Sequence, residues 1–372
     1  MRRWNHPTYM IYRLILAIRN ARYKGGRHSV KAGVPTVCVG NITVGGTGKT
    51  PHAEMILEML LGSERWGSAN LALLSRGYKR RSKGFQQVPY NGTAELYGDE
   101  PLQIKRKFPQ VTVAVDKNRV EACDILTHPE KAGSLKKCAF PSFPPAELIL
   151  LDDAYQYRKL QADLNIVLVD FNRPVTEDQL LPGGRLRDLK SRLYDADIVI
   201  VTKCPYALEP QEKMEMAQVL GFDSYDPGSC IAVRRSRSLP LLFTGVEYGR
   251  PLPVFETEAD SRYIYSHKIA LFTGIADDTP LRNYLSDKYK IVEHLHFPDH
   301  HAYTASDAAT LKAALKHNPT AAFVTTEKDA QRLRDFSRIL QALRARTFYF
   351  PISAVFHSDN ERRILIEKLT AL

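Results

Sequence analysis

The segment that decides the fold is Val37-Cys-Val-Gly-Asn-Ile-Thr-Val-Gly-Gly-Thr-Gly-Lys-Thr-Pro51. It begins with a short β-branched run that is typical of a buried strand, and the apolar residues from Ala53 to Leu61 recur at helical spacing. The glycine-rich turn between them ends in Lys49-Thr50, as in a phosphate-binding loop. In such a loop, backbone N–H groups and the helix N-terminus together attract phosphate. The sequence therefore predicts that the chain binds a nucleoside triphosphate.

The residues of this loop have separate expected roles. Lys49 should reach the β- and γ-phosphates, and the hydroxyl of Thr50 should hold Mg²⁺. Thr43 stands five positions before Gly48, where the usual motif has a small residue, so Gly45 and Gly46 are expected to supply the turn. The residues predicted to contact the nucleotide are Thr43, Val44, Gly45, Gly46, Thr47, Gly48, Lys49 and Thr50.

A second apolar run, Leu148 to Leu151, ends in two aspartates. A buried parallel strand would deliver them to its carboxyl end, where open α/β sheets bind ligands. Asp152 is the predicted Mg²⁺ ligand, and Asp153 could assist through the metal or through water. Together with further apolar runs at 70–75, 111–115, 165–170 and 198–202, these residues predict a doubly wound, mostly parallel sheet.

The length of 372 residues is sufficient for two domains. The proline- and glycine-rich stretch Pro240–Pro253 looks like a join, and three further strand-like runs follow it before a terminal helix. We therefore expect an amphipathic segment over residues 1–28, a P-loop domain over 29–238 and a smaller α/β domain over 239–372.

The net charge of +11 favours anionic partners. Near the N-terminus, the apolar residues Ile11, Leu14, Ile15 and Ile18 lie on one helical stripe, surrounded by the basic residues Arg2, Arg3, Arg13, Arg19, Arg22 and Lys24. The arginines interrupt the stretch, which excludes a signal peptide, and about 20 apolar residues for a membrane span are lacking. Two interpretations stay open: the helix packs on the protein, or it lies in a membrane interface.

The segment His294-Leu-His296-Phe-Pro-Asp299-His300-His301 brings five potential metal ligands together. A metal site is one interpretation of this pattern. An Asp–His pair presented to a cleft and a cluster that is merely exposed are the other two.

With these residues assembled, the chain resembles the tetraacyldisaccharide 4′-kinases of lipid A synthesis. The resemblance covers most of the chain and depends on Val39–Pro51, Ser75–Tyr78, Gly98–Pro101, Leu151–Asp153 with Gln156, Leu181–Arg187, Phe272–Ile275, Phe297–His301 and Thr326–Asp329. There are two departures: Tyr157 stands where the family usually has His, and Asp188 where Glu is common.

The resemblance implies that the ATP γ-phosphoryl group is transferred to the 4′-hydroxyl of a tetraacylated glucosamine disaccharide 1-phosphate. It implies Asp99 as proton acceptor with His300 as its partner, Asp153 assisting, and closure of the second domain to bring His300 to the site. It also favours peripheral or monotopic attachment at the cytoplasmic face of the bacterial inner membrane. The substrate-contact candidates are Asn41, Arg76, Tyr78, Glu100, Gln156, Arg185, Arg187 and Asp188.

Two other classes of function stay open. One is a P-loop switch or metal-delivery NTPase that has no small-molecule acceptor. The other, a nucleic-acid-binding NTPase, is suggested by charge alone, because the chain lacks the interleaved aromatic and basic stripe of such surfaces. We expect no nucleic acid and no obligate protein partner.

Overall fold

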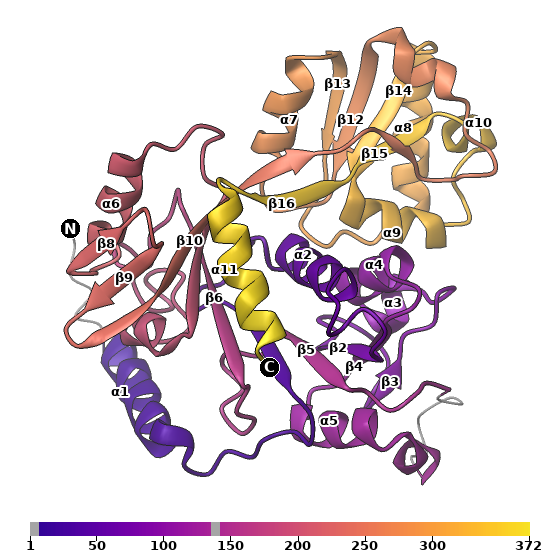
Figure 1. Cartoon of the computed structure of the whole chain (residues 1–372). Coiled ribbons are helices and arrows are strands. Elements are labelled where there is room, and N and C mark those ends of the chain that lie inside the picture. The colour runs from indigo at the N-terminus through magenta and orange to yellow at the C-terminus, as the bar shows by residue number, and fades with distance from the viewer. Residues whose placement is uncertain (1–6, 135–141) are drawn as a thin grey trace.

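A computed structural model describes residues 7–134 and 142–372 as an α/β protein with two sheets (Figure 1). The elements up to the end of the first pass through the larger sheet are α1 (Pro7–Arg22), η1 (Lys24–Gly26), β1 (Thr36–Gly40), α2 (Lys49–Leu61), β2 (Leu71–Ser75), β3 (Gln86–Gln87), α3 (Ala94–Tyr97), α4 (Asp99–Lys107), β4 (Thr112–Val115), α5 (Arg119–Thr127), η2 (Pro129–Ser134), β5 (Leu148–Asp152), β6 (Leu164–Asp170), η3 (Lys190–Asp195), β7 (Ile198–Thr202), α6 (Pro210–Val219), β8 (Ser224–Asp226), β9 (Ile231–Arg234) and β10 (Arg237–Tyr248).

The remaining elements build the smaller sheet and then return to the larger one. They are β11 (Leu252–Pro253), η4 (Ser261–Ser266), β12 (Lys268–Thr273), α7 (Thr279–Ser286), β13 (Lys290–His296), α8 (Ala305–His317), β14 (Ala322–Thr326), α9 (Glu327–Asp335), α10 (Gln341–Arg344), β15 (Thr347–Phe350), β16 (Ile352–Phe356) and α11 (Asp359–Thr370).

The larger sheet has β1 near its centre, and its strands follow the order β3-β4-β2-β5-β1-β6-β7-β10-β9-β8. From β4 to β10 along this order, neighbouring strands run parallel. Every residue of β1, β2, β5 and β7 is buried, as expected for strands covered on both faces. The predicted doubly wound, mostly parallel sheet is confirmed.

The smaller sheet has the order β11-β15-β14-β12-β13 and its own hydrophobic core, which includes the buried rings of Phe272 and Phe323. Its strands β15, β14, β12 and β13 are parallel, and β11 is antiparallel to β15. The expected second, smaller α/β unit is present. It packs against the larger unit where its helix α9 contacts α4 (Figure 1).

The expected join at Pro240–Pro253 does run from the larger sheet to the smaller one, but most of it is a strand. Residues 237–248 instead form β10, which pairs with β7 in the larger sheet and, further along, antiparallel with β16. Pro240 is the last residue of β10 that pairs with β9, and pairing with β7 begins at Leu241, so the proline stands at the end of a ladder and not inside one. A division at residue 239 would therefore cut through a strand.

After the smaller sheet the chain returns to the larger one. A single domain boundary in the sequence therefore cannot separate the two units. After β16, helix α11 packs on α2, and the indole N–H of Trp66 donates to the carbonyl of Leu369 at 3.0 Å. The C-terminal helix thus belongs to the core of the larger sheet.

Helix α1 packs through a face that the sequence pattern did not indicate. Leu16 is buried, whereas the predicted stripe of Ile11, Leu14, Ile15 and Ile18 is 55–62% exposed. Arg2 and Arg3, the first basic residues of the predicted interface, lie outside the described residues. Along the part of the chain that the structure describes, no helix combines the length and apolar character needed to cross a membrane.

Candidate active site

The phosphate-binding loop follows β1 and is fixed by its own side chains. Gly48 has φ +80°, a left-handed conformation that glycine adopts without strain, and α2 begins at the next residue. The Asn41 amide donates to Thr47 Oγ1 at 2.7 Å, and the Thr47 carbonyl accepts from Thr202 Oγ1 at 3.0 Å. The N–H of Val44 donates to the carbonyl of Arg185 at 2.8 Å. The loop is therefore held from both sides by neighbouring segments.

The two aspartates lie at the carboxyl end of β5, beside this loop. Ser75 Oγ donates to Asp152 Oδ2 at 2.9 Å, while Oδ1 of the same carboxylate is buried without a partner. Burial, reinforced by the charge of Asp153, raises the pKa of Asp152 to about 6. An orphaned carboxylate oxygen with a second carboxylate next to it is the oxygen donor set that Mg²⁺ prefers, so these residues fit the expected ion.

Asp153 is tied to the basic residues of the site. Burial alone would raise the pKa of Asp153. The positive charges of Lys49, whose Nζ lies 3.9 Å from Asp153 Oδ1, and of Arg187 outweigh this effect and hold the pKa below its usual value. The Arg187 guanidinium also donates to Asn41 Oδ1, and Gln156 donates to the carbonyl of Asn41. The structure therefore brings five of the predicted residues into one polar network at the phosphate loop.

Asp99 and His300 meet, although they come from different sheets. Asp99 begins α4 directly after Gly98, and its Oδ2 lies 2.9 Å from His300 Nδ1. Arg332 of α9 donates from Nε to Asp99 Oδ1 at 3.0 Å. Burial would raise the pKa of Asp99, but His300 and Arg332 hold it at about 2. The ring of Tyr78 packs edge-on against His300, with centroids 5.5 Å apart.

The remaining predicted residues differ in their placement. Glu100 pairs with Lys328 at 2.5 Å, which links α4 to α9 a second time. Arg76 is exposed, and Arg185 lines a shallow pocket together with Thr43–Thr47. Asp188 needs a correction: its side chain is fully buried and accepts from Arg19 and Asn20, both at 2.8 Å. It anchors α1 to the larger unit.

Sequence reasoning assigned no role in the site to Arg332, Lys328 or Arg119. Arg332 lies three residues after Asp329, and its Nη1 donates to that carboxylate at 2.9 Å. The i, i+3 spacing between Asp329 and Arg332 can be recognised in the sequence and indicates an ion pair. The contact of Arg332 with Asp99 cannot, because it depends on the packing of two helices that are distant in the chain. Arg119 is buried near Asp152 and Asp153. Burial and the charge of Arg76 lower the pKa of Arg119, and the two carboxylates partly offset this lowering.

The histidine-rich segment divides among three carboxylates. His300 faces Asp99, His301 Nε2 lies 2.9 Å from Asp307 Oδ2, and His294 and His296 both approach Asp278. For His300, the interpretation as half of an Asp–His pair therefore agrees with the geometry.

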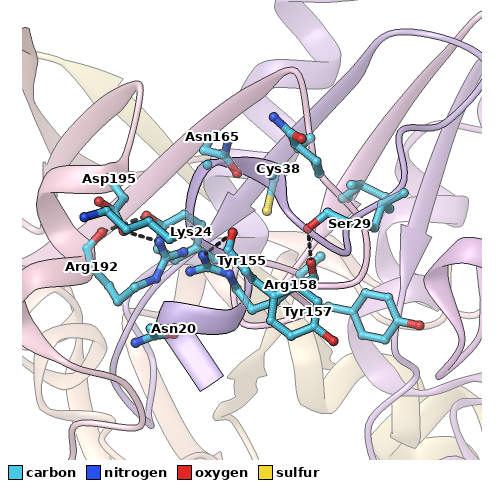
Figure 2. A pocket seen from close by; sticks show the side chains of 18 of the residues that line it. Asn20, Lys24, Ser29, Cys38, Tyr155, Tyr157, Arg158, Asn165, Arg192 and Asp195 are labelled. Atoms are coloured by element: carbon cyan, nitrogen blue, oxygen red, sulfur yellow. Dashed lines mark hydrogen bonds and ion pairs between the residues drawn. The ribbon is translucent and has the colours of Figure 1, made fainter. Parts of the chain in front are cut away.

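A cavity of about 520 Å³ lies beside the C-terminal end of α1 (Figure 2). Basic residues dominate its charged lining, which includes Lys24, Arg158, Arg192 and Arg237 with the single carboxylate of Asp195. Nη1 of Arg158 is buried without a partner. Ala154 and Tyr155, which also line the cavity, directly follow the aspartate pair in the chain.

Comparison with known proteins agrees with this geometry. The model of the family described as tetraacyldisaccharide-1-P 4′-kinase matches residues 1–370. The tetraacyldisaccharide 4′-kinase of Phocaeicola vulgatus is 34% identical over 371 residues, covering 96% of this chain and 92% of the relative. That of Parabacteroides distasonis is 35% identical and covers 89% of this chain and 83% of the relative. The solved LpxK of Aquifex aeolicus in complex with ATP has a TM-score of 0.68 at 24% identity, covering 98% of this chain and 97% of that chain.

A phosphate loop followed by paired aspartates, in a sheet of this order, defines a P-loop kinase fold. The chain belongs to the tetraacyldisaccharide-1-P 4′-kinase family and is an ATP-dependent kinase. The family name implies a lipid disaccharide as substrate, and the switch-NTPase alternative is not favoured.

One further histidine, His52 of α2, connects the phosphate loop to β10. Its Nδ1 lies 2.7 Å from the carbonyl of Gly48, and its Nε2 lies 2.9 Å from Thr244 Oγ1. Burial lowers the pKa of His52 to about 4. The ring is therefore neutral in the folded protein at neutral pH.

In the unfolded chain this histidine has a pKa of about 6.5, so between pH 6.5 and 4 it takes up a proton that it does not bind in the folded chain. The free energy of unfolding therefore decreases as the pH is lowered through this window. We expect wild type to lose about 1 kcal/mol more unfolding free energy than His52→Gln between pH 7 and 5.5. Urea denaturation at both pH values measures this, with the exposed His317→Gln as the matched control. An identical pH dependence in His52→Gln and wild type would contradict the role of His52.

Proposed function

We propose that the chain transfers the γ-phosphoryl group of Mg²⁺-ATP to the 4′-hydroxyl of a tetraacylated glucosamine disaccharide 1-phosphate. The observation that carries this assignment is the Asp99–His300 pair at the start of α4. Glu100, the neighbour of Asp99, lies close enough to Asp152 to contribute to raising its pKa. A proton acceptor therefore lies near the residues that would hold the nucleotide.

Positioning and charge neutralisation supply most of the catalysis in phosphoryl transfer. Lys49 and the N–H groups of the loop would bind the β- and γ-phosphates. Thr50 and the free oxygen of Asp152 would hold Mg²⁺, which when bound offsets the phosphate charge. Arg187 holds Asp153 beside Lys49 and keeps that carboxylate ionised.

The acceptor hydroxyl must lose a proton to a group within hydrogen-bond reach. A carboxylate with a pKa of about 2 binds a proton weakly, so Asp99 alone is a poor acceptor. As an anion 2.9 Å from Nδ1 of His300 it instead orients the ring, with Nε2 left to face the acceptor hydroxyl. The Asp99–His300 pair is thus the proposed base, and Arg332 is a positioning residue that keeps Asp99 ionised.

Loss of Arg332 should change the pH profile as well as the rate. In Arg332→Gln, burial is no longer offset by the guanidinium, so the pKa of Asp99 rises toward the assay range, and we expect the acid limb of kcat/KM to move to higher pH as protonation of Asp99 disables the pair. The matched control is Arg334→Gln on the same helix, whose guanidinium Nε bonds to the Val254 carbonyl. A uniform fall in rate with an unshifted profile would show that Arg332 acts only on stability.

The activity itself is tested in detergent with purified protein, Mg²⁺-ATP and the tetraacylated disaccharide 1-phosphate, with the product followed by mass spectrometry. We expect one added phosphate at the 4′ position and a loss of at least about 100-fold in Lys49→Ala, because a phosphate clamp is removed. The exposed Lys312→Ala serves as the control. ATP hydrolysis without a lipid product would overturn the assignment.

The acylated substrate places the reaction at a membrane surface, and α1 suits contact with one. Its exposed stripe carries Ile11, Leu14, Ile15 and Ile18, with Met10 beside it, while its other face is bonded to the protein. We propose peripheral or monotopic attachment at the cytoplasmic face of the bacterial inner membrane through this stripe. The basic cavity at the C-terminal end of α1 suits the phosphate-bearing sugar head of the lipid.

Charge on the stripe should release the protein from bilayers. Each apolar side chain that leaves the interface forfeits about 1.5–3 kcal/mol, so Leu14→Glu/Ile18→Glu should bind vesicles at least tenfold more weakly than wild type. Co-sedimentation with vesicles containing anionic phospholipid measures this. The control Val219→Glu/Leu252→Glu adds the same charges at exposed apolar sites elsewhere. Equal sedimentation of both variants would contradict the proposed orientation.

A further inference from the structure

We infer that the smaller α/β unit carries a site for a divalent transition-metal ion, formed by Asp278, His294 and His296. His294 Nε2 lies 2.8 Å from Asp278 Oδ2, and His296 Nδ1 lies 3.3 Å from the same oxygen. The three potential ligand atoms all lie within 4.8 Å of one another. None of these three residues is among those predicted to bind the nucleotide or its Mg²⁺.

The fold explains why these residues converge. His294 and His296 are two positions apart on β13, so their side chains project from the same face of the strand. Strand β13 is the edge of the smaller sheet and pairs in parallel with β12, where His296 is in register with Thr273. Asp278 follows β12 at the start of α7, and so reaches the same end of the sheet.

Asp278 does not serve its own helix. An aspartate at this position usually accepts hydrogen bonds from the first helical N–H groups, but its side chain makes no such bond here. The preceding Asp277 accepts from the Thr279 N–H at 3.0 Å instead. The buried carboxylate of Asp278 is turned toward the histidines and is oriented by Thr273 Oγ1 at 2.5 Å, an arrangement typical of outer-shell partners of metal ligands.

The spacing of the ligand atoms suits a small transition-metal ion. With metal–ligand bonds of about 2.0–2.2 Å, two ligands of a tetrahedral ion lie about 3.3–3.6 Å apart. The two separations from Asp278 Oδ2, 2.8 and 3.3 Å, lie below and at the lower end of this range.

Ligand chemistry separates this site from that of Mg²⁺. Two imidazoles and one carboxylate favour Zn²⁺, Co²⁺ or Ni²⁺, whereas Mg²⁺ prefers oxygen ligands. The side chain of His296 is half-exposed and that of His294 partly so, which leaves the further coordination positions to water. The geometry therefore points to an open site with three protein ligands.

Ion binding would tie together two strand ends from which a functional loop begins. The N–H of Phe297, directly after His296, donates to the Thr273 carbonyl at 2.7 Å, and the N–H of His300 donates to the Gly274 carbonyl at 3.1 Å. An ion that joins β13 to the segment after β12 would stiffen the base of the loop that carries His300.

The test uses the full chain without a histidine affinity tag, freed of metal by a chelator and titrated with Co²⁺ in the absence of nucleotide. We expect visible Co²⁺ absorption that saturates at one ion per chain and is displaced by Zn²⁺. It should persist in Asp152→Asn, which excludes the nucleotide site. In His294→Ala/His296→Ala, Co²⁺ binding should weaken at least tenfold.

Matched controls separate coordination from a general effect of histidine loss. His128→Ala removes a histidine from an exposed pair with Asp124, 3.2 Å apart, that has no second histidine in the described chain near it, and should leave Co²⁺ binding unchanged. Asp278→Asn keeps the size of the side chain and should also weaken binding at least tenfold, which decides the case if the double variant does not fold. Absence of Co²⁺ absorption in wild type, or unchanged absorption in Asp278→Asn, would overturn the inference.

Discussion

The buried charge of Asp99 is the constraint on which the site depends. Removing a carboxylate from water costs several kcal/mol unless the charge is paired and hydrogen-bonded. The larger sheet, which supplies Asp99, leaves this compensation to the other unit: Arg332 comes from α9, and His300 from the loop after β13. The buried charge of Asp99 is therefore compensated only by the packing of the two units against each other. The pair of Glu100 and Lys328 repeats this dependence one residue further along α4.

The path of the chain makes this packing dependable. Strand β10 leaves the larger sheet and β16 returns to it, and the two pair antiparallel between the units. Helix α11 then fixes the returning chain on α2, the helix that begins at the phosphate loop. Glu361 of α11 is buried and accepts from Lys213 and from the N–H of Phe243 in β10. The smaller unit is thus held at both of its ends by the core that carries the nucleotide site.

The parts that the sequence predicted are those coded locally. The phosphate loop, the aspartates after β5 and most strands follow from short patterns, and the resemblance extended them to the meeting of Asp99 and His300. At Pro240–Pro253 the proline and glycine content indicated a break in regular structure, whereas the chain continues as β10 because it pairs on both sides of Pro240. Arg332 and the packed face of α1 were missed for a related reason. Their partners, Asp99 and Asp188, are distant in the chain, and no periodicity reports such contacts.

Helix α1 reverses the usual relation between apolar pattern and packing. An ordinary amphipathic helix buries its apolar stripe and exposes its polar face. Here polar side chains bind α1 to the protein: Tyr12 donates to the Arg187 carbonyl, and Arg19 and Asn20 bond to Asp188. Arg187 in turn contacts Asp153 at the reaction site. Arg187 and Asp188, which are adjacent in the chain, join α1 to the site. A surface that binds the exposed stripe of α1 therefore takes up a fixed position relative to the phosphate loop. Attachment through α1 would thus orient the site as well as hold the protein at the membrane.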